Sequence, residues 1–230
     1  MKLCIAVPCY SGQMSFQFVN SLLQTYKEFA KLGISLDFKV APGLCYADLA
    51  RNILVDAFLK SDATDLLFID DDIGFKPEAV LRILRLKEEI VGGVYPYKNE
   101  IESYPVNPVI DSKGNYIVNE NGLIEVYGLP AGFLRIKRGV LEDYIHAHPE
   151  TKCVTSDHAG NVMHSFHNIF RCRQDAQGWY GEDMEFVNIM NNFGVKVWVM
   201  PDIDFVHVGN RSFRGNFQTF AIKQATNVNC

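Results

Sequence analysis

Short apolar segments alternate with stretches of helical periodicity along the first half of the chain. The segment Leu3–Val7 has no polar alternation, as expected for a strand buried on both faces of a sheet. From Phe18 to Phe29 apolar residues recur at helical spacing, and Gly33 stands where a left-handed residue would end that helix. The pattern predicts an α/β fold with a mostly parallel central sheet flanked by helices.

The same alternation continues to the end of the chain. Further strands are predicted over 34–40, 65–69, 90–95, 133–136, 195–200 and 203–208. Further helices are predicted over 47–59, from Pro77 onward, over 138–147 and over 182–192. Gly92 and Gly93 interrupt one of these strands, which indicates a close backbone approach or a bulge.

Two regions depart from this pattern. Turn-forming residues punctuate 104–132, where 116–118 and 123–127 are predicted to form a small antiparallel hairpin. Residues 149–180 are polar and lack periodicity, so they are predicted to form one long loop. Whether 216–230 is a helix or a frayed tail is left open.

Composition narrows the class of protein. The 230 residues are 48% hydrophobic and suit one folded domain. Lys and Arg number 22 against 27 Asp and Glu, which argues against a nucleic-acid binder. No apolar run approaches the roughly 20 residues of a membrane span, and no targeting segment is recognised, so a cytoplasmic location is expected, with peripheral membrane association left open. Six cysteines without a CxxC pair indicate free thiols.

The most specific chemistry lies at Asp70, Asp71 and Asp72, directly after the apolar strand 65–69. Ligands of open α/β sheets bind beyond the carboxyl ends of the strands. Three adjacent acids there repel one another unless a cation neutralises them, and carboxylate oxygens suit Mg²⁺ or Mn²⁺. Asp70 and Asp72 would point the same way in an extended chain. A solvated acidic turn is the alternative.

An apolar strand, Asp-x-Asp and a proline-started helix resemble the DxD segment of GT-A glycosyltransferases, above all small soluble bacterial or viral enzymes similar to family two. Five other segments fall in that family's order, one of which is the acidic pair Glu182 and Asp183. Residues 5–11, with Pro8, Tyr10 and Ser11, resemble the loop around the donor's uridine. Arg51 resembles the arginine on the helix that faces the nucleotide. Gly132 resembles the glycine beneath the sugar. His207 resembles the distal histidine of the metal site.

This resemblance implies a GT-A (nucleotide-diphospho-sugar transferase) fold in a single domain over 1–215. Residues 1–100 would bind the nucleotide sugar, 101–215 would form the acceptor side, and 216–230 would be a C-terminal tail. The implied activity is metal-dependent transfer of a sugar, of the hexosyltransferase class, from a UDP-linked donor to a hydroxyl. The acceptor, whether a glycan or a lipid-linked or protein-linked molecule, is left open.

The resemblance also assigns roles to the acidic residues and the histidine. Asp72 would be the direct ligand of Mn²⁺ or Mg²⁺, and His207 would complete the site and favour Mn²⁺. Asp70 is counted with Asp72 and His207 in the metal site, where it would contact the ribose or a metal-bound water, and the role of Asp71 beside the donor is open. Asp183, next to Glu182, resembles the catalytic base of inverting members. Alternatively, both acids only complement the N-terminus of their helix.

Two further features remain open at this level. Arg211 and Arg214 flank a glycine-rich turn that could bind the diphosphate, or they belong to a solvated tail. Trp179 and Tyr180 could stack on an acceptor sugar or serve as ordinary packing residues.

Three other functions share parts of the pattern. A sugar nucleotidyltransferase would share the layout, although it would normally carry a glycine-rich loop after the first strand. A phosphatase of the haloacid-dehalogenase type would use Asp70 as its nucleophile. A non-catalytic glycan-binding or nucleotide-sugar-binding module would bind without turnover.

Overall fold

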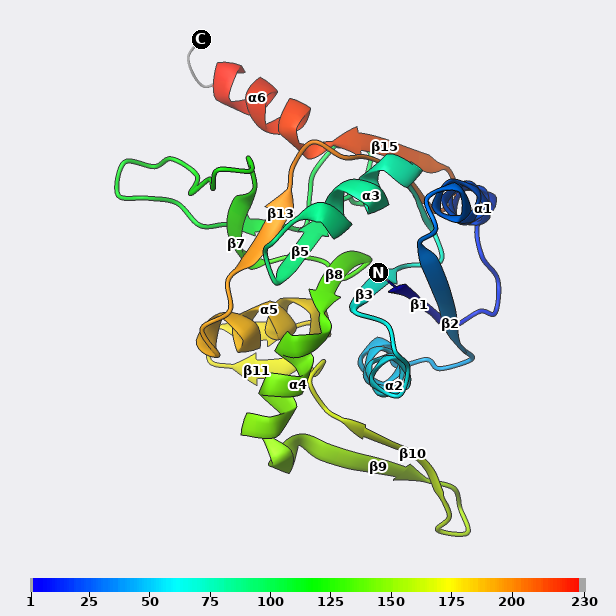
Figure 1. Ribbon diagram of the computed structural model, residues 1–230. Helices are drawn as coiled ribbons and strands as arrows, with labels where there is room; N and C mark the ends of the chain where they lie inside the picture. Colours follow the sequence, from blue (N-terminus) through cyan, green and yellow to red (C-terminus); the bar gives the residue numbers. More distant parts are fainter. Residues whose placement is uncertain (1, 228–230) are drawn as a thin grey trace.

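The computed structural model describes residues 2–227, and within them the largest sheet has eight strands in the order β2-β1-β3-β8-β5-β13-β7-β6 (Figure 1). These strands are β1 (Lys2–Cys9), β2 (Ser35–Pro42), β3 (Asp65–Ile69), β5 (Ile90–Gly93), β6 (Asn107–Pro108), β7 (Ile124–Gly128), β8 (Phe133–Lys137) and β13 (Val197–Met200). Strands β7 and β8 run antiparallel to their neighbours, whereas the other described strands of this sheet share one direction. The mostly parallel α/β sheet is confirmed.

Helices cover both faces of this sheet (Figure 1). The described helices are α1 (Phe16–Lys31), α2 (Ala47–Leu59), α3 (Pro77–Arg85), α4 (Arg138–Ala147), α5 (Glu182–Asn192) and α6 (Phe217–Asn227). Along β3, Leu66 and Phe68 join the core of α2, α4 and α5, whereas Leu67 and Ile69 join the core of α1 and α3. This two-sided burial explains why β3 is continuously apolar.

The helix boundaries follow local chemistry. Ser15 begins α1, because its hydroxyl accepts a hydrogen bond from the Phe18 N–H at 3.1 Å. Gly33 follows the end of α1 with φ of 65°, the left-handed conformation predicted for it. Pro77 is the first residue of α3, as predicted.

The close approach predicted at the paired glycines is confirmed. A Cβ on Gly92 would lie 2.6 Å from Leu129 Cδ2, and one on Gly93 would lie 2.5 Å from the Phe205 ring. The hairpin predicted nearby is confirmed in part. Its second strand is β7, while 116–118 pairs only through isolated bridges, such as the one between Val118 and Ile124.

The prediction of one long loop over 149–180 is wrong. This region contains a short 3-10 helix (Pro149–Thr151) and two antiparallel ribbons, β9 (Lys152–Ser156) with β10 (Val162–His167), and β11 (Arg173–Asp175) with β12 (Gly178–Tyr180). Most residues of these ribbons are exposed or half-buried and polar, so the strands show no clear apolar alternation. Their turns do carry a recognisable signal, an aspartate (Asp157, Asp175) followed three residues later by a glycine with positive φ.

A separate three-stranded sheet joins β4 (Ile73–Gly74), β14 (Asp204–Val208) and β15 (Ser212–Asn216) in the order β15-β14-β4. The glycine-rich turn predicted around Arg211 and Arg214 is thus largely strand β15. Residues 217–227 form α6, which settles the question left open for most of the tail. Met1, the first residue of the predicted domain, and 228–230, the end of the predicted tail, lie outside the described residues.

The prediction of free thiols is confirmed for the cysteines that the structure describes. Cys4, Cys9, Cys45, Cys153 and Cys172 are free thiols, and Cys230 lies outside the described part of the chain. Over residues 2–227, no helix combines the length and the apolar character needed to cross a lipid bilayer.

Candidate active site

Most of the predicted site residues gather at the carboxyl ends of β1, β3 and β5. Asp70, Asp71 and Asp72 follow β3, and a second polar segment, Tyr95 to Lys98, follows β5. Because the two strands are parallel, these segments meet at the same edge of the sheet.

Arg51 of α2 lies at the centre of this edge. Its side chain is buried and donates through Nη2 to Asp70 Oδ1 at 2.9 Å and through Nε to Glu182 Oε1 at 3.2 Å. Nη1 donates to the Ala131 carbonyl at 3.4 Å. Burial by itself would lower the pKa of Arg51, but the neighbouring carboxylates of Asp70 and Glu182 outweigh burial and raise it. Arg51 therefore joins three segments that are far apart in the sequence.

Tyr95 and Gly132 hold the other side of Asp70. The Tyr95 hydroxyl donates to Asp70 Oδ2 at 3.4 Å and accepts from the Gly132 N–H at 3.2 Å. The Asp70 N–H in turn donates to the Gly132 carbonyl at 3.1 Å. Burial, followed by the Asp70 charge, raises the pKa of the Tyr95 phenol well above its usual value, so the phenol stays a donor.

Gly132→Ala is expected to disrupt this arrangement. A Cβ at Gly132 would lie 2.2 Å from the Tyr95 hydroxyl and 2.4 Å from Asp70 Oδ2, so both side chains must shift. We expect a loss of about 1–3 kcal/mol of unfolding free energy, measured by urea denaturation. Gly139→Ala in α4 is the control, because a Cβ at Gly139 has no neighbour within 4 Å and alanine favours a helix. Equal stability of the two variants would contradict the expectation.

Asp72 lies on the other side of Tyr95, against His207 of β14. The Asp72 Oδ1 and His207 Nε2 atoms are 3.6 Å apart, and the His207 ring packs edge-on against Tyr95 with ring centroids 4.8 Å apart. His207 Nδ1 lies 2.8 Å from the Pro96 carbonyl, which can only accept, so Nδ1 carries a proton. In the neutral ring, Nε2 therefore presents a lone pair toward Asp72.

The three expected metal ligands are not assembled as one group. Over residues 2–227, no three His, Cys, Asp or Glu side chains converge closely enough to hold a metal ion. The reason is a turn: the Ile73 N–H donates to the Asp70 carbonyl at 3.1 Å, so the segment is not extended and Asp70 faces Arg51 while Asp72 faces His207. The prediction that Asp70 and Asp72 share one orientation through an extended chain is therefore wrong.

Asp72 and His207 nevertheless fit a divalent cation. Asp72 Oδ1 is buried and has no hydrogen-bond partner among the described residues, and it lies 3.6 Å from His207 Nε2, the ring nitrogen left free to bind a cation by the contact of Nδ1 with Pro96. Lys98 forms an ion pair with Asp72 Oδ2, and this positive charge favours the ionised carboxylate. A carboxylate and an imidazole suit Mn²⁺, and such ions commonly take substrate phosphates as further ligands.

Asp71 faces the end of β1. Its carbonyl accepts from the Ser15 N–H at 2.9 Å, which ties the acidic segment to the start of α1. Burial raises the pKa of its carboxyl, which lies beside the Cys9 thiol, and that thiol has a pKa raised to about 11 by burial and then by Asp71. Asp71 is thus separated from the contacts of Asp70 and Asp72.

Glu182 and Asp183 occupy the first turn of α5. Glu182 is bound to Arg51, whereas Asp183 accepts only from the Met184 N–H, at 2.7 Å, among the hydrogen bonds of the described residues. Burial, followed by the Glu182 charge, raises the pKa of Asp183 to about 6. A carboxyl group with a pKa near neutrality suits proton transfer.

The other predicted ligands are more peripheral. Pro8 is within β1, and Tyr10 and Ser11 are exposed in the turn that follows it. Arg211 lies over the Phe213 ring at 4.9 Å. Arg214 pairs with Val206 in the ribbon, next to the pairing of Phe213 with His207, so it lies on the opposite face from His207. The structure therefore does not bring Arg214 to the acidic residues.

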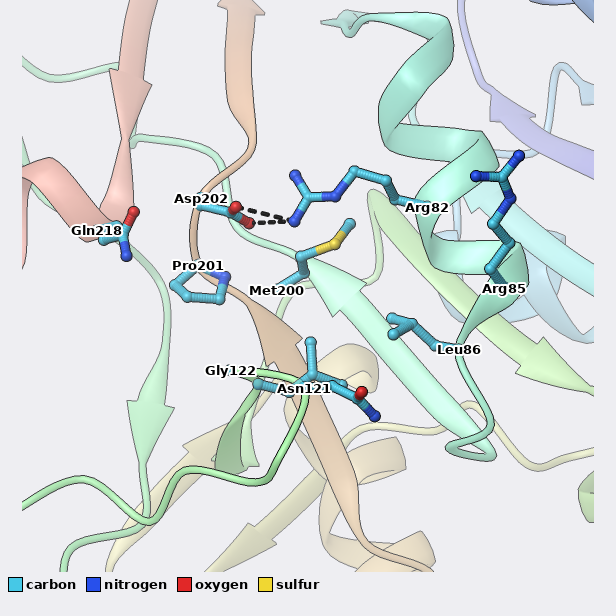
Figure 2. A pocket seen from close by; sticks show the side chains of 10 residues that line it. Arg82, Arg85, Leu86, Asn121, Gly122, Met200, Pro201, Asp202 and Gln218 are labelled. Carbon is cyan, nitrogen blue, oxygen red and sulfur yellow. Dashed lines mark hydrogen bonds and ion pairs between the residues drawn. The ribbon is translucent and has the colours of Figure 1, made fainter.

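Three contributors to the site were not predicted from the sequence. Tyr95 and Lys98 bind the two aspartates, and the Ala131 carbonyl accepts from Arg51. The signal for Tyr95 and Lys98 was their place after the apolar strand β5, the same signal that identified the aspartates after β3. A separate pocket between the end of α3 and residues 121–123 is lined by Arg82 and Asp202 and contains none of the predicted residues (Figure 2).

Comparison with known proteins concerns the fold. No family model and no curated sequence matches the chain. Among solved structures, A197 from STIV has 18% identity, covers 91% of this chain and 86% of its own, and superposes with a TM-score of 0.55. S. aureus TarS 1-349 has 13% identity over 87% of this chain and 58% of its own, with a TM-score of 0.44. The inositol-1-phosphate CTP transferase from T. maritima has 9% identity over 90% of this chain and 88% of its own, with a TM-score of 0.46.

The similarity to A197 covers nearly the whole of both chains and shows a shared fold. A mostly parallel sheet covered by helices on both faces is the arrangement that the sequence predicted, whereas the separate sheet β15-β14-β4 was not predicted. The chain has a GT-A-type fold.

Proposed function

We propose that this chain is a metal-dependent glycosyltransferase that moves a sugar from a nucleoside-diphosphate donor, with UDP as the nucleotide, to a hydroxyl group of an acceptor. The observation that carries the proposal is the pair formed by Asp72 and His207. Asp72 Oδ1 is buried without a hydrogen-bond partner among residues 2–227 and lies 3.6 Å from His207 Nε2. This pair lies at the carboxyl edge of an α/β sheet, which Arg51 links to Glu182 of α5. The GT-A-type fold is consistent with this reading.

In the proposed reaction, Asp72 and His207 would hold a divalent cation together with the donor's phosphates. When bound, that cation supplies Lewis-acid stabilisation of the negative charge on the diphosphate leaving group. Asp183 removes the proton from the acceptor hydroxyl. The acceptor oxygen then bonds to the anomeric carbon of the donor sugar, while the bond between that carbon and the diphosphate oxygen breaks and the nucleoside diphosphate leaves. Attack from the side opposite the leaving group inverts the anomeric configuration.

The remaining residues position these groups. Arg51 balances the charges of Asp70 and Glu182 and keeps the start of α5 beside the end of β3. Tyr95 holds Asp70 on one side and packs against His207 on the other. Because the guanidinium group of Arg51 is occupied by protein acceptors, we assign it to positioning and not to the nucleotide.

These contacts also bear on the alternatives. As a phosphatase nucleophile, Asp70 would need an oxygen free to attack, yet both of its oxygens accept hydrogen bonds, from Arg51 and from Tyr95. A nucleotidyltransferase would release pyrophosphate, whereas a glycosyltransferase releases a nucleoside diphosphate, so identifying the product separates these two enzymes.

Titration calorimetry of UDP, GDP and CMP, with and without Mn²⁺, tests the donor site. We expect UDP to bind wild type only with Mn²⁺ and Asp72→Ala to weaken binding at least about tenfold, because a ligand of the cation is lost. Asp204→Ala is the control, because Asp204 lies on the same small sheet but pairs with Lys76 and Asn216. Failure of every nucleotide to bind wild type with Mn²⁺ would overturn the proposal.

A further inference from the structure

Lys98 already supplies a positive charge to the carboxylate assigned to the metal. Its ammonium group forms an ion pair with Asp72 Oδ2, while His207 faces Oδ1. The two side chains of the ion pair are only partly exposed, 38% for Lys98 and 27% for Asp72. Solvent therefore screens this pair less than an ordinary surface pair.

The path of the lysine side chain depends on a glycine. A Cβ on Gly209 would lie 3.0 Å from Lys98 Cδ and 3.7 Å from Cγ, so the stem of Lys98 runs closely across the backbone just after β14. Gly209 is itself fixed by its N–H, which donates to the Arg211 carbonyl at 2.9 Å. The side chain of Lys98 therefore packs closely against the backbone at Gly209, between the segment that follows β5 and the end of β14.

Asp72 cannot bind a divalent cation with full affinity while it remains paired with the ammonium group of Lys98. Both are cations directed at one carboxylate, and at contact distances they repel strongly in a partly buried site. The donor would bring two phosphates to the same place. A lysine has a flexible four-carbon stem and a compact charge, which lets it move a few ångströms to a phosphate oxygen.

We propose that Lys98 is an internal counter-ion of this site: it neutralises Asp72 when the site is empty, yields to the divalent cation, and then binds the donor diphosphate. This inference rests on the proposed function, since it takes Asp72 to be a metal ligand. Lys98 is then a residue that couples metal binding to donor binding, because the cation is held tightly only when phosphate has drawn the lysine away.

Another lysine–aspartate pair, in which the aspartate is the first residue of β14, provides a comparison. Lys76 pairs with Asp204 at 3.0 Å, but the two side chains are 70% and 60% exposed, and both oxygens of Asp204 have partners, Lys76 and Asn216. No buried oxygen there lacks a partner among the described residues. Lys76 therefore serves as a matched control of the same charge and side chain.

The test measures Mn²⁺ alone and UDP separately. We expect Lys98→Met to bind Mn²⁺ without nucleotide about tenfold more tightly than wild type. The electron paramagnetic resonance signal of free Mn²⁺ measures this affinity. We expect the same variant to bind UDP about tenfold more weakly at saturating Mn²⁺, measured by calorimetry. Lys98→Arg keeps the positive charge and should bind Mn²⁺ and UDP with affinities close to those of wild type. Lys76→Met should change neither affinity.

The outcomes separate this inference from the proposed function. If wild type binds UDP with Mn²⁺ but Lys98→Met binds Mn²⁺ no more tightly than wild type, the counter-ion role is overturned and the proposed function stands. Unchanged UDP affinity in Lys98→Met overturns the phosphate-binding step. If wild type binds no nucleotide with Mn²⁺, the proposed function and this inference fail together.

Discussion

Arg51→Met is expected to lose about 3–5 kcal/mol of unfolding free energy at pH 7.5, the largest effect on stability that the site predicts. The substitution keeps much of the side-chain volume but removes the charge between Asp70 and Glu182. These two carboxylates and Asp183 then remain close together in a partly buried space without their counter-charge. Urea denaturation followed by circular dichroism measures the loss.

The pH dependence of this loss identifies its cause. Asp183 has a pKa of about 6, so below that pH it becomes neutral and one source of repulsion disappears. The deficit of Arg51→Met should therefore shrink between pH 7.5 and pH 5. Arg82→Met is the control, because Arg82 donates to both oxygens of Asp202 on the surface, at 2.9 and 2.8 Å (Figure 2). An exposed pair of this kind contributes about 1 kcal/mol or less.

Asp183→Asn is expected to lower the turnover number by about 10²–10⁴-fold, the largest effect on activity, because an amide cannot accept the acceptor's proton. The nucleotide affinity with Mn²⁺ should remain near that of wild type, since Asp183 does not contact Asp72 or His207. Asp143→Asn, at an exposed position of α4, is the matched control and should leave turnover unchanged. Retention of full turnover by Asp183→Asn would exclude Asp183 as the base.

The raised pKa of Asp183 sets two opposite pH trends. Wild-type turnover should increase as pH rises through about 6, because only the ionised carboxylate accepts a proton. Stability should move the other way. The folded-state pKa lies above the unfolded value of about 3.9, so the stabilising contribution is complete below pH 4 and is lost as pH rises through 6. Above pH 6, Asp183→Asn should therefore melt at a higher temperature than wild type.

Four elements could be predicted from the sequence to the residue. Helices α2, α4 and α5 and strand β3 begin and end where they were expected. Their residues alternate or recur with the period of the element, and burial on both faces gives β3 its continuous apolar run. The ribbons within 149–180 were missed because their strands are short and mostly polar, and only Phe166 of β10 is buried.

One of those ribbons is fixed by a contact that no local pattern could reveal. Asn52, next to Arg51 on α2, accepts from the N–H groups of Ile169 and Phe170 at 3.0 and 2.9 Å and donates to the Phe170 carbonyl at 2.7 Å. The segment after β10 is therefore held by a side chain more than a hundred residues away. Adjacent residues of one helix thus organise the acidic site and the base of a ribbon.

The sequence by itself determined that carboxylates follow the apolar strand β3 and begin α5, which is where ligands of an α/β sheet bind. Only the tertiary structure decided which side chains each of these carboxylates contacts. The turn after β3 sends Asp70 toward Arg51 and Tyr95 and sends Asp72 toward His207 and Lys98. Such pairings depend on distances between β3, α2, β5, α5 and β14, which meet only when the sheet has formed. Charge balance in a buried site is a property of those distances, and no residue pattern along the chain encodes it locally.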